Sequence, residues 1–181
     1  MVNNNLNLRE NEKIVKDLTV LKLKKNFGFI KNDEYEEELI DLTTDYELTD
    51  FSETLSKIAF KAVLKEVENM ELEGEDVKVL LNEKLELHCD GVVTEVNADV
   101  ILMSKDSIEV IDIKSFDYDF INSSQDIDIK LLGLATIDKF LTSITNDKIR
   151  LTIIQPNLMT ASIYETNIMS LLHQCEYNLI W

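Results

Sequence analysis

The chain has 181 residues, which is long enough for one domain with a sizeable core and too short for two ordinary domains. Its 35 aspartates and glutamates exceed its 18 lysines and arginines, which gives a formal net charge of -17. An apolar fraction of 45% nevertheless excludes a disordered acidic chain, so we expect a single folded domain over residues 1–181.

The sequence also indicates the compartment in which the protein works. No run of residues approaches the ~18 apolar residues of a membrane span, and the opening MVNNNLNLRENEK lacks the apolar stretch of a secretory signal. Cys89 and Cys175 are too few for a disulfide framework and form no CxxC pair, so both are interpreted as buried thiols. These features predict a cytoplasmic protein without membrane contact.

The amino-terminal part of the chain is predicted to be helical. Residues 10–25 are interpreted as one helix and residues 33–46 as a second, with Asn32 as a candidate cap. Residues 1–50 then form an accessory acidic region. The clearest helix runs over residues 52–70, because its apolar residues recur at three- and four-residue spacing.

The charge pattern of this region conflicts with ordinary nucleic-acid binding, because phosphate contacts normally require a basic surface. Between Asp33 and Glu53 the chain has ten acids and no lysine or arginine. The nearest basic cluster surrounds Phe27 and Phe29 and consists of Lys22, Lys24, Lys25 and Lys31. This cluster is interpreted either as a contact for a nucleic-acid backbone or as a solvated helix end.

A change of period from about 3.6 to 2 marks the start of a sheet. Residues 77–88 alternate apolar and polar side chains, as a strand with one buried face does, and Asp90 with Gly91 is a hairpin turn signal. Residues 92–103 and 108–114 are two more strands, apolar on both faces. A sheet of this kind requires a covering layer on each side.

The remaining elements alternate between helix and strand. A helix is predicted from about Gln125 to Ile144, and a strand over residues 149–155, closed by Pro156. A short extended piece around Ile163 and a helix over about residues 167–176 complete the chain. The core order is therefore helix, three strands joined by hairpins, helix and strand.

The second hairpin predicts a cluster of charged side chains. Its polar turn is centred between Lys105 and Asp106, so partner numbers sum to 211 and Asp99 faces Asp112. Directly opposed Cβ atoms lie ~4.5–5.5 Å apart, and like charges there are destabilising unless something neutralises them. Lys114 follows Asp112 by two residues, so the alternation of the strand places its amine on the same face.

A divalent cation would neutralise the aspartate pair. Hard oxygen ligands hold Mg²⁺ or Mn²⁺, such an ion activates water and polarises a phosphate, and an adjacent amine stabilises the nucleophile or the developing charge. The same three residues also fit an Asp–Asp–Lys network that neutralises itself. The D-x-K spacing alone leaves both interpretations open.

Four segments of the chain resemble a known superfamily. The run NADVILMSKDSIEVIDIKS at residues 97–115 resembles the PD-(D/E)xK nucleases, in particular their RecB-like exonuclease branch. NEKLEL at 82–87, LLGLA at 131–135 and TIIQPNL at 152–158 fall in the order of a phage-borne, RecB-like family. The resemblance covers about residues 77–175 and implies an α/β fold with a restriction-endonuclease-like core and helices on both faces of the sheet.

The resemblance implies a role for each residue of the cluster. Asp99 and Asp112 correspond to the carboxylate ligands of Mg²⁺ or Mn²⁺, and the carbonyl of Ile113 to a further ligand. Lys114 corresponds to the catalytic lysine.

The chain also departs from the family pattern. Members of this branch usually have a histidine ligand on an upstream helix, and no histidine precedes His88 here. Glu66, on the apolar side of its predicted helix, is the substitute we name as a metal ligand, with Glu53 and Glu68 as competitors.

A second departure follows the lysine. The family has a glycine-containing loop and a Gln-x-x-x-Tyr helix start there, whereas residues 115–124 have no glycine. Alignment through Gly133 puts Asp126 at the glutamine position, with Gln125 one residue away and Lys130 at the tyrosine position. Gln125 and Asp126 are therefore accessory candidates, and these departures put catalysis in doubt more than the fold.

Other candidates have weaker support. Glu83 shares the parity of Leu81 and Leu85, so it either faces Asp99 as a further metal ligand or pairs with a lysine, and we favour the structural role. His88 and the second histidine, at position 173, have no metal-ligand partners at a usable spacing. No GxSxG, Cys–His or phosphate-binding glycine loop is present in the sequence.

These observations predict a metal-dependent DNA nuclease of phage or prophage origin, acting in the bacterial cytoplasm. Residues 51–156 form its nuclease-like core and residues 157–181 a strand and helix extension. DNA would be held through the metal and through a partner protein or a local basic patch. The alternative is a catalytically degenerate nuclease fold that binds a host or phage nucleic-acid-binding protein as an acidic DNA mimic, or that serves as a subunit of a larger complex.

Overall fold

The computed structural model describes residues 2–46, 48–72, 76–89, 92–140 and 147–179, and the side chains of 2–9, 72, 89 and 175–179 lie outside this description. The thiols of Cys89 and Cys175, the Asp90–Gly91 turn and the predicted helix end at Ile144 therefore fall outside the described part of the chain.

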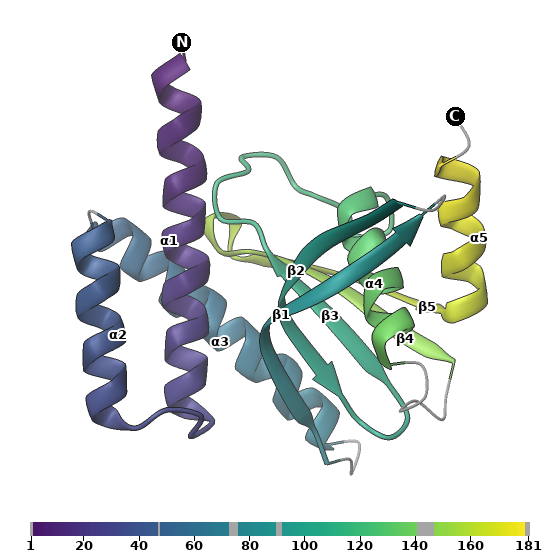
Figure 1. Cartoon of the computed structure of the whole chain (residues 1–181), viewed down its shortest axis with the longest axis horizontal. Coiled ribbons are helices and arrows are strands. Elements are labelled where there is room, and N and C mark those ends of the chain that lie inside the picture. Colours follow the sequence, from purple (N-terminus) through teal and green to yellow (C-terminus); the bar gives the residue numbers. More distant parts are fainter. Residues whose placement is uncertain (1, 47, 73–75, 90–91, 141–146, 180–181) are drawn as a thin grey trace.

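Helices and strands follow one another in the predicted order (Figure 1). The chain begins with α1 (Val2–Asn26), α2 (Asn32–Asp45) and α3 (Asp50–Leu72), and continues with β1 (Lys78–Cys89), β2 (Val92–Met103) and β3 (Ile108–Ile113). Then come α4 (Ile127–Phe140), β4 (Lys148–Gln155), the short 3-10 helix η2 (Pro156–Leu158), β5 (Thr160–Asn167) and α5 (Ile168–Leu179). No helix within the described ranges combines the length and the apolar content that a membrane crossing requires.

The strands form one five-stranded mixed sheet in the order β1-β2-β3-β4-β5. β1, β2 and β3 pair antiparallel, as the two hairpins predict. β3 and β4 are parallel, because α4 returns the chain to the same end of the sheet before β4 begins, and β5 pairs antiparallel with β4. The extended piece predicted around Ile163 is thus a full edge strand.

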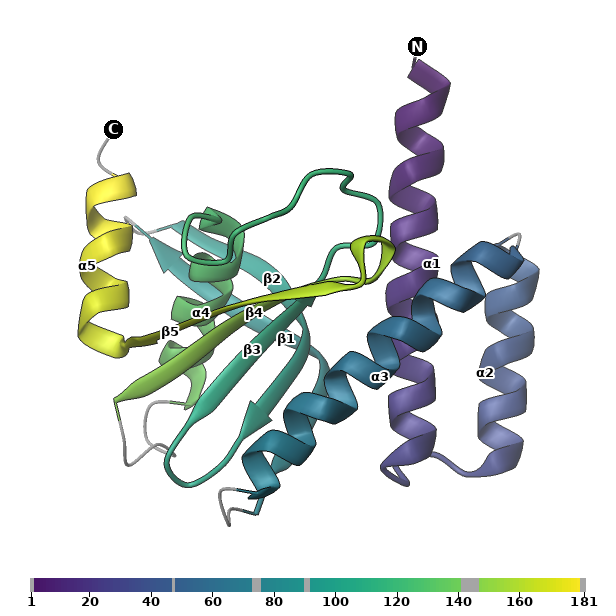
Figure 2. The same ribbon diagram turned by 180° about the vertical axis from the view of Figure 1, so that it is seen from behind.

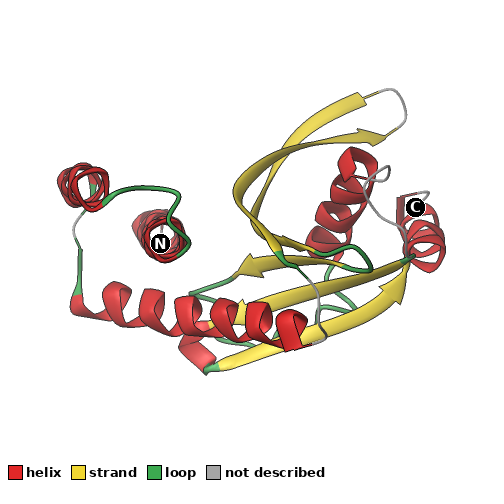
Figure 3. Ribbon diagram, turned by 90° about the horizontal axis from the view of Figure 1, so that it is seen from below, coloured by secondary structure: helices red, strands yellow, loops and turns green. Residues whose placement is uncertain are grey.

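Helices cover both faces of the sheet, as the apolar character of β2 and β3 predicts (Figure 3). Alternate residues of each strand enter different cores. Ile101 and Val110 pack on the α4 side, whereas Leu102 and Ile111 pack on the side of α3. The apolar residues in the middle of the sheet are consequently buried from solvent on both faces.

The first helix belongs to the core, although its sequence was interpreted as accessory. α1 lies between α2 and the sheet, and its contacts are mainly with α3 (Figures 1 and 2). Val15, Leu18 and Leu23 are fully or almost fully buried. In contrast, none of the residues of α2 is buried, so α2 forms the outer, accessory layer.

The first strand contains an irregularity that corrects the predicted alternation. Asn82 has a left-handed backbone with φ of 51°, and the pairing with β2 keeps its register on both sides of it. Leu81 packs on the α3 side and Leu85 is buried on the α4 side. The strand therefore changes face at Asn82, and Leu81 and Leu85 do not share one face as their parity indicated.

Candidate functional site

The second hairpin has the predicted register. Val100 pairs with Ile111 and Met103 with Ile108, so Asp99 and Asp112 are the next residues beyond the last backbone pair. The amide of Ile113 donates a hydrogen bond to Oδ2 of Asp99 over 2.8 Å. This bond ties the end of β3 to the Asp99 side chain, and it shows the Ile113 amide, rather than its carbonyl, in contact with the pair.

A lysine from the first helix bridges the two aspartates. Nζ of Lys16, on α1, lies 3.1 Å from Oδ2 of Asp99 and 2.9 Å from Oδ1 of Asp112. Sequence reasoning missed Lys16, because it assigned α1 to an accessory region. The only signal was a charged residue adjoining the apolar pair Ile14 and Val15, and such a residue cannot be placed without knowing where the helix packs.

Lys114 joins the same cluster from the other side. Its Nζ lies 3.6 Å from Oδ2 of Asp112 and 3.1 Å from Oδ2 of Asp126. Asp126 is held in place because its Oδ1 accepts a hydrogen bond from the amide of Ile129 over 2.9 Å, which caps the start of α4. Gln125, one residue earlier, has an exposed side chain. Of the two accessory candidates, the structure therefore brings Asp126 to the cluster.

The two aspartates differ in their protonation. Burial raises the pKa of Asp99 to about 7, against the lowering effect of Lys16. Burial also acts to raise the pKa of Asp112, but the charges of Lys16 and Lys114 outweigh it, so this pKa lies below its usual value. Burial acts to lower the pKa of Lys16, and the two aspartates reverse this effect. Asp112 is thus the constant anion of the pair.

Glu12 is a third carboxylate at the edge of this cluster. It lies one helical turn before Lys16, and its Oε1 is 3.7 Å from Nζ of Lys16. Burial raises the pKa of Glu12, and the nearby charges that act on it include Asp112 and Lys114. A pocket of about 420 Å³ between α1 and the β1–β2 hairpin is lined by Glu12, Lys16 and Asp99 together with Asn82.

The structure does not bring Glu66 to the aspartate pair. Oε2 of Glu66 lies 3.0 Å from Nη2 of Arg150, and Nη1 of the same arginine lies 3.4 Å from Oε2 of Glu109. Glu109 and Asp112 are three residues apart on β3, so they point to opposite faces of the sheet. The naming of Glu66 as a metal ligand is therefore corrected: it is on the inner side of α3, as expected, but α3 covers the other face.

The other carboxylate candidates also have partners elsewhere or face solvent. Glu53 pairs with Lys57 at 2.7 Å, and Glu68 is exposed. Glu83 pairs with Nζ of Lys139 at 2.6 Å, which is the structural role favoured for it. Because β1 changes face at Asn82, that asparagine lines the pocket beside Asp99.

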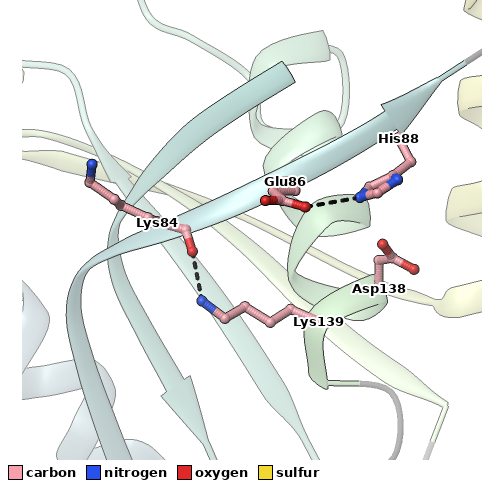
Figure 4. Close-up of a pocket in the computed structure, with 5 residues that line it drawn as sticks. All are labelled: Lys84, Glu86, His88, Asp138 and Lys139. Carbon is pink, nitrogen blue, oxygen red and sulfur yellow. Dashed lines mark hydrogen bonds and ion pairs between the residues drawn. The ribbon is translucent and has the colours of Figure 1, made fainter. Parts of the chain in front are cut away.

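The region around His88 does not form a metal centre. His88 and Glu86 lie together on β1, with Nε2 of His88 3.3 Å from Oε2 of Glu86, above Asp138 and Lys139 of α4 (Figure 4). Across the described ranges, no group of three or more histidine, cysteine, aspartate or glutamate side chains is arranged to hold a metal ion. The second histidine, at position 173, is exposed on α5.

The chemistry of the aspartate pair still fits a hard divalent ion. Asp99 and Asp112 offer carboxylate oxygens, which Mg²⁺ and Mn²⁺ prefer, and Mg²⁺ is commonly held by one or two carboxylates with water and substrate completing its shell. The raised pKa of Asp99 shows that the buried pair does not readily hold a second negative charge. The pair therefore needs nearby positive charge, and the ammonium groups of Lys16 and Lys114 supply part of it.

Comparisons with known proteins give a family and little else. A family model described as "Protein of unknown function (DUF2800)" matches residues 10–179. No curated protein matches the chain. Among solved structures, one described as "Crystal structure of SSO0001" is similar at 17% identity with a TM-score of 0.35, and the match covers 99% of this chain and 86% of that one. So low a TM-score does not establish a common fold.

Proposed function

We infer the function of this chain, which belongs to the DUF2800 family, from the geometry of its site, and propose that it is a metal-dependent nuclease hydrolysing phosphodiester bonds in DNA. The observation that carries this proposal is the meeting of Asp99, in the interior of β2, with Asp112 and Lys114 at the carboxyl end of β3. A core of the restriction-endonuclease type and a phage or prophage origin are parts of the same proposal, and the resemblance of residues 97–115 supports them.

The cost of the cluster argues for a functional role. Two carboxylates that are almost fully buried beside each other lose solvation and repel, and packing alone would be served better by apolar residues. Such arrangements concentrate at functional sites. The neighbouring Lys114 has a side chain that is 13% exposed, so its amine is mostly covered and is held against the carboxylates of the site.

Each residue then has a part in the reaction. Asp99, Asp112 and the carbonyl of Ile113 would hold Mg²⁺ or Mn²⁺. When bound, the ion supplies Lewis-acid activation of water and of the phosphate. Lys114 supplies an ammonium group to orient the nucleophile or to stabilise developing negative charge, and Asp126 positions this group from the cap of α4.

DNA affinity has to come mainly from outside the basic cluster near Phe27. Lys24 pairs with Glu38 at 2.8 Å, Lys25 lies 4.0 Å from the ring centroid of Tyr35, and Lys22 donates to Ser56. These lysines are already engaged, and the net charge of -17 repels phosphate. We therefore propose that a partner protein supplies most of the affinity for DNA.

Digestion of linear DNA in Mn²⁺ tests the proposal. Lys114→Ala is expected to reduce the cleavage rate at least about 100-fold, because it removes one preorganised charge from the site. Lys57→Ala is the matched control, since Lys57 is exposed and its carboxylate partner is Glu53 on the surface of α3. Lys57→Ala should melt like the parent, and Lys114→Ala should melt at a lower temperature but remain folded at the assay temperature, because it loses ion pairs to Asp112 and Asp126. Because the chain alone is expected to bind DNA weakly, the assay uses high concentrations of protein and DNA, and failure of the parent to cut single- or double-stranded DNA in Mg²⁺ or Mn²⁺ under these conditions contradicts the proposal.

A second candidate function is protein binding by a catalytically degenerate nuclease fold. The observation that favours it is α2, which has no buried residue and exposes six acids, namely Asp33, Glu34, Glu36, Glu37, Asp41 and Asp45. An acidic helix of this kind can imitate the phosphates of DNA toward a nucleic-acid-binding protein.

A further inference from the structure

We propose that Lys16 occupies the cation position between Asp99 and Asp112, so that a divalent ion binds only by displacing the Lys16 ammonium group. This inference rests on the proposed function and concerns the regulation of the same site. It assigns to α1 the role of a built-in competitor for the metal.

The geometry of Lys16 is that of a bridging cation. Its Nζ contacts one oxygen of each aspartate, at 3.1 Å and 2.9 Å, which are ordinary lengths for charge-assisted hydrogen bonds. The side chains of Asp99 and Asp112 are 12% and 9% exposed, so water screens these contacts weakly. Lys114 contacts Asp112 but not Asp99, so it does not bridge the two aspartates as Lys16 does.

An ammonium group and a divalent ion cannot share the position. Mg²⁺ binds carboxylate oxygens at about 2.0–2.1 Å, so an ion on the same oxygens would lie only a few ångströms from Nζ. Two cations this close in a partly buried site repel strongly. The lysine must leave before the ion enters.

The structure also offers Lys16 a position to move to. Glu12 lies one turn earlier on α1 with its carboxylate 3.7 Å from Nζ, and both residues line the pocket of about 420 Å³ beside Asp99. The flexible four-carbon stem of lysine allows this movement without shifting the helix. α1 itself stays fixed, because Val15 and Leu18 are buried on either side of Lys16 in the sequence.

Calorimetric titration with Mn²⁺ alone tests the inference. Lys16→Met keeps most of the side-chain volume and removes the charge, so it is expected to bind Mn²⁺ at least about tenfold more tightly than the parent. Lys25→Met is the matched control on the same helix, where the lysine lies over Tyr35, and should bind like the parent. Lys16→Arg keeps the charge and should bind no more tightly.

The outcomes separate this inference from the proposed function. Equal Mn²⁺ affinity of the parent and Lys16→Met, or weaker binding by the variant, overturns the competitor role and leaves the metal site standing. No binding by either protein overturns both. If Lys16→Met fails to fold, the test uses the parent protein and the side-chain ¹⁵N resonance of Lys16. Mg²⁺ is expected to shift this resonance, because the ammonium group leaves the aspartates. An unchanged resonance at Mg²⁺ saturation overturns the inference.

Discussion

Asp99 and Asp112 are chemically unequal although they face each other across one hairpin. Asp112 contacts both Lys16 and Lys114, whereas Asp99 contacts Lys16 and the amide of Ile113. The pKa of Asp112 lies below its usual value under the charges of the lysines, while burial raises that of Asp99 to about 7. The negative charge of the pair therefore resides on Asp112 and is costly on Asp99.

This inequality predicts different effects of neutralising each aspartate. Asp112→Asn removes the common partner of two lysines and should cost about 2–4 kcal/mol of unfolding free energy. Asp99→Asn keeps an oxygen for the Ile113 amide and removes a charge that the site holds poorly, so it should cost less than about 1 kcal/mol. Urea denaturation at pH 7 without divalent ions measures both. A larger loss for Asp99→Asn would contradict the assignment.

At this scale the sequence predicts contacts made by local pairing but not those made by packing. A symmetric hairpin fixes which residues face each other, so Asp99, Asp112 and Lys114 could be predicted from spacing. Lys16 is separated from Asp112 by 96 positions, and only the docking of α1 brings them together. Glu12 was missed for the same reason.

Among the elements, α3, β3 and β4 share a second charged cluster. Glu109 on β3 is fully buried, its Oε1 accepts a hydrogen bond from Oγ1 of Thr152 on β4 at 2.5 Å, and Arg150 connects it to Glu66 on α3. Burial raises the pKa of Glu109 from 4.5 to about 7. The three elements are therefore joined by a group that changes charge near neutrality.

The stability of this junction should fall as the pH rises. The folded state binds a proton at Glu109 more tightly than the unfolded chain does, so folding is favoured below pH 4.5 and loses this contribution as the pH passes through 7. Relative to Glu109→Gln, the parent should lose roughly 2–3 kcal/mol of unfolding free energy between about pH 4.5 and 8. Urea titrations of both proteins across this range measure the difference. A difference that is independent of pH contradicts the expectation.

The predictability of the elements depends on how regular each one is. The predicted bounds of β2 match the structure and those of α3, 52–70, lie two residues inside it at each end, because apolar periodicity reflects the side-chain packing on the faces of the sheet. The change of face at Asn82 could not be predicted, because a left-handed residue inside a strand leaves no pattern in apolar spacing. The role of α1 was missed because buried apolar and charged residues alternate along it.

Over the whole molecule, the longest run of acids without a lysine or arginine lies away from the sheet, in and after α2. α2 forms the outer layer beyond α1, and its acids face solvent, apart from Glu38, which pairs with Lys24 (Figure 2). The buried site and the acidic layer are thus separate features, one where β3 ends beside the interior of β2 and one on the outermost helix. The proposed metal site and the proposed partner surface would therefore lie at separate places on the molecule.

The acidic layer gives the last prediction, which distinguishes a DNA mimic from a solvated helix. Glu36→Lys, Glu37→Lys and Asp41→Lys combined should abolish capture of a nucleic-acid-binding protein from host lysate, because they reverse the charge at exposed positions of α2. Capture by the parent should weaken as salt is raised, since the Debye length falls from about 10 Å at 0.1 M to about 3 Å at 1 M. Lys114→Ala is the control and should retain the partner, since Lys114 lies beside Asp112 at the end of β3 and not on α2. If the same partner survives charge reversal, or the parent captures none, α2 is a solvated surface.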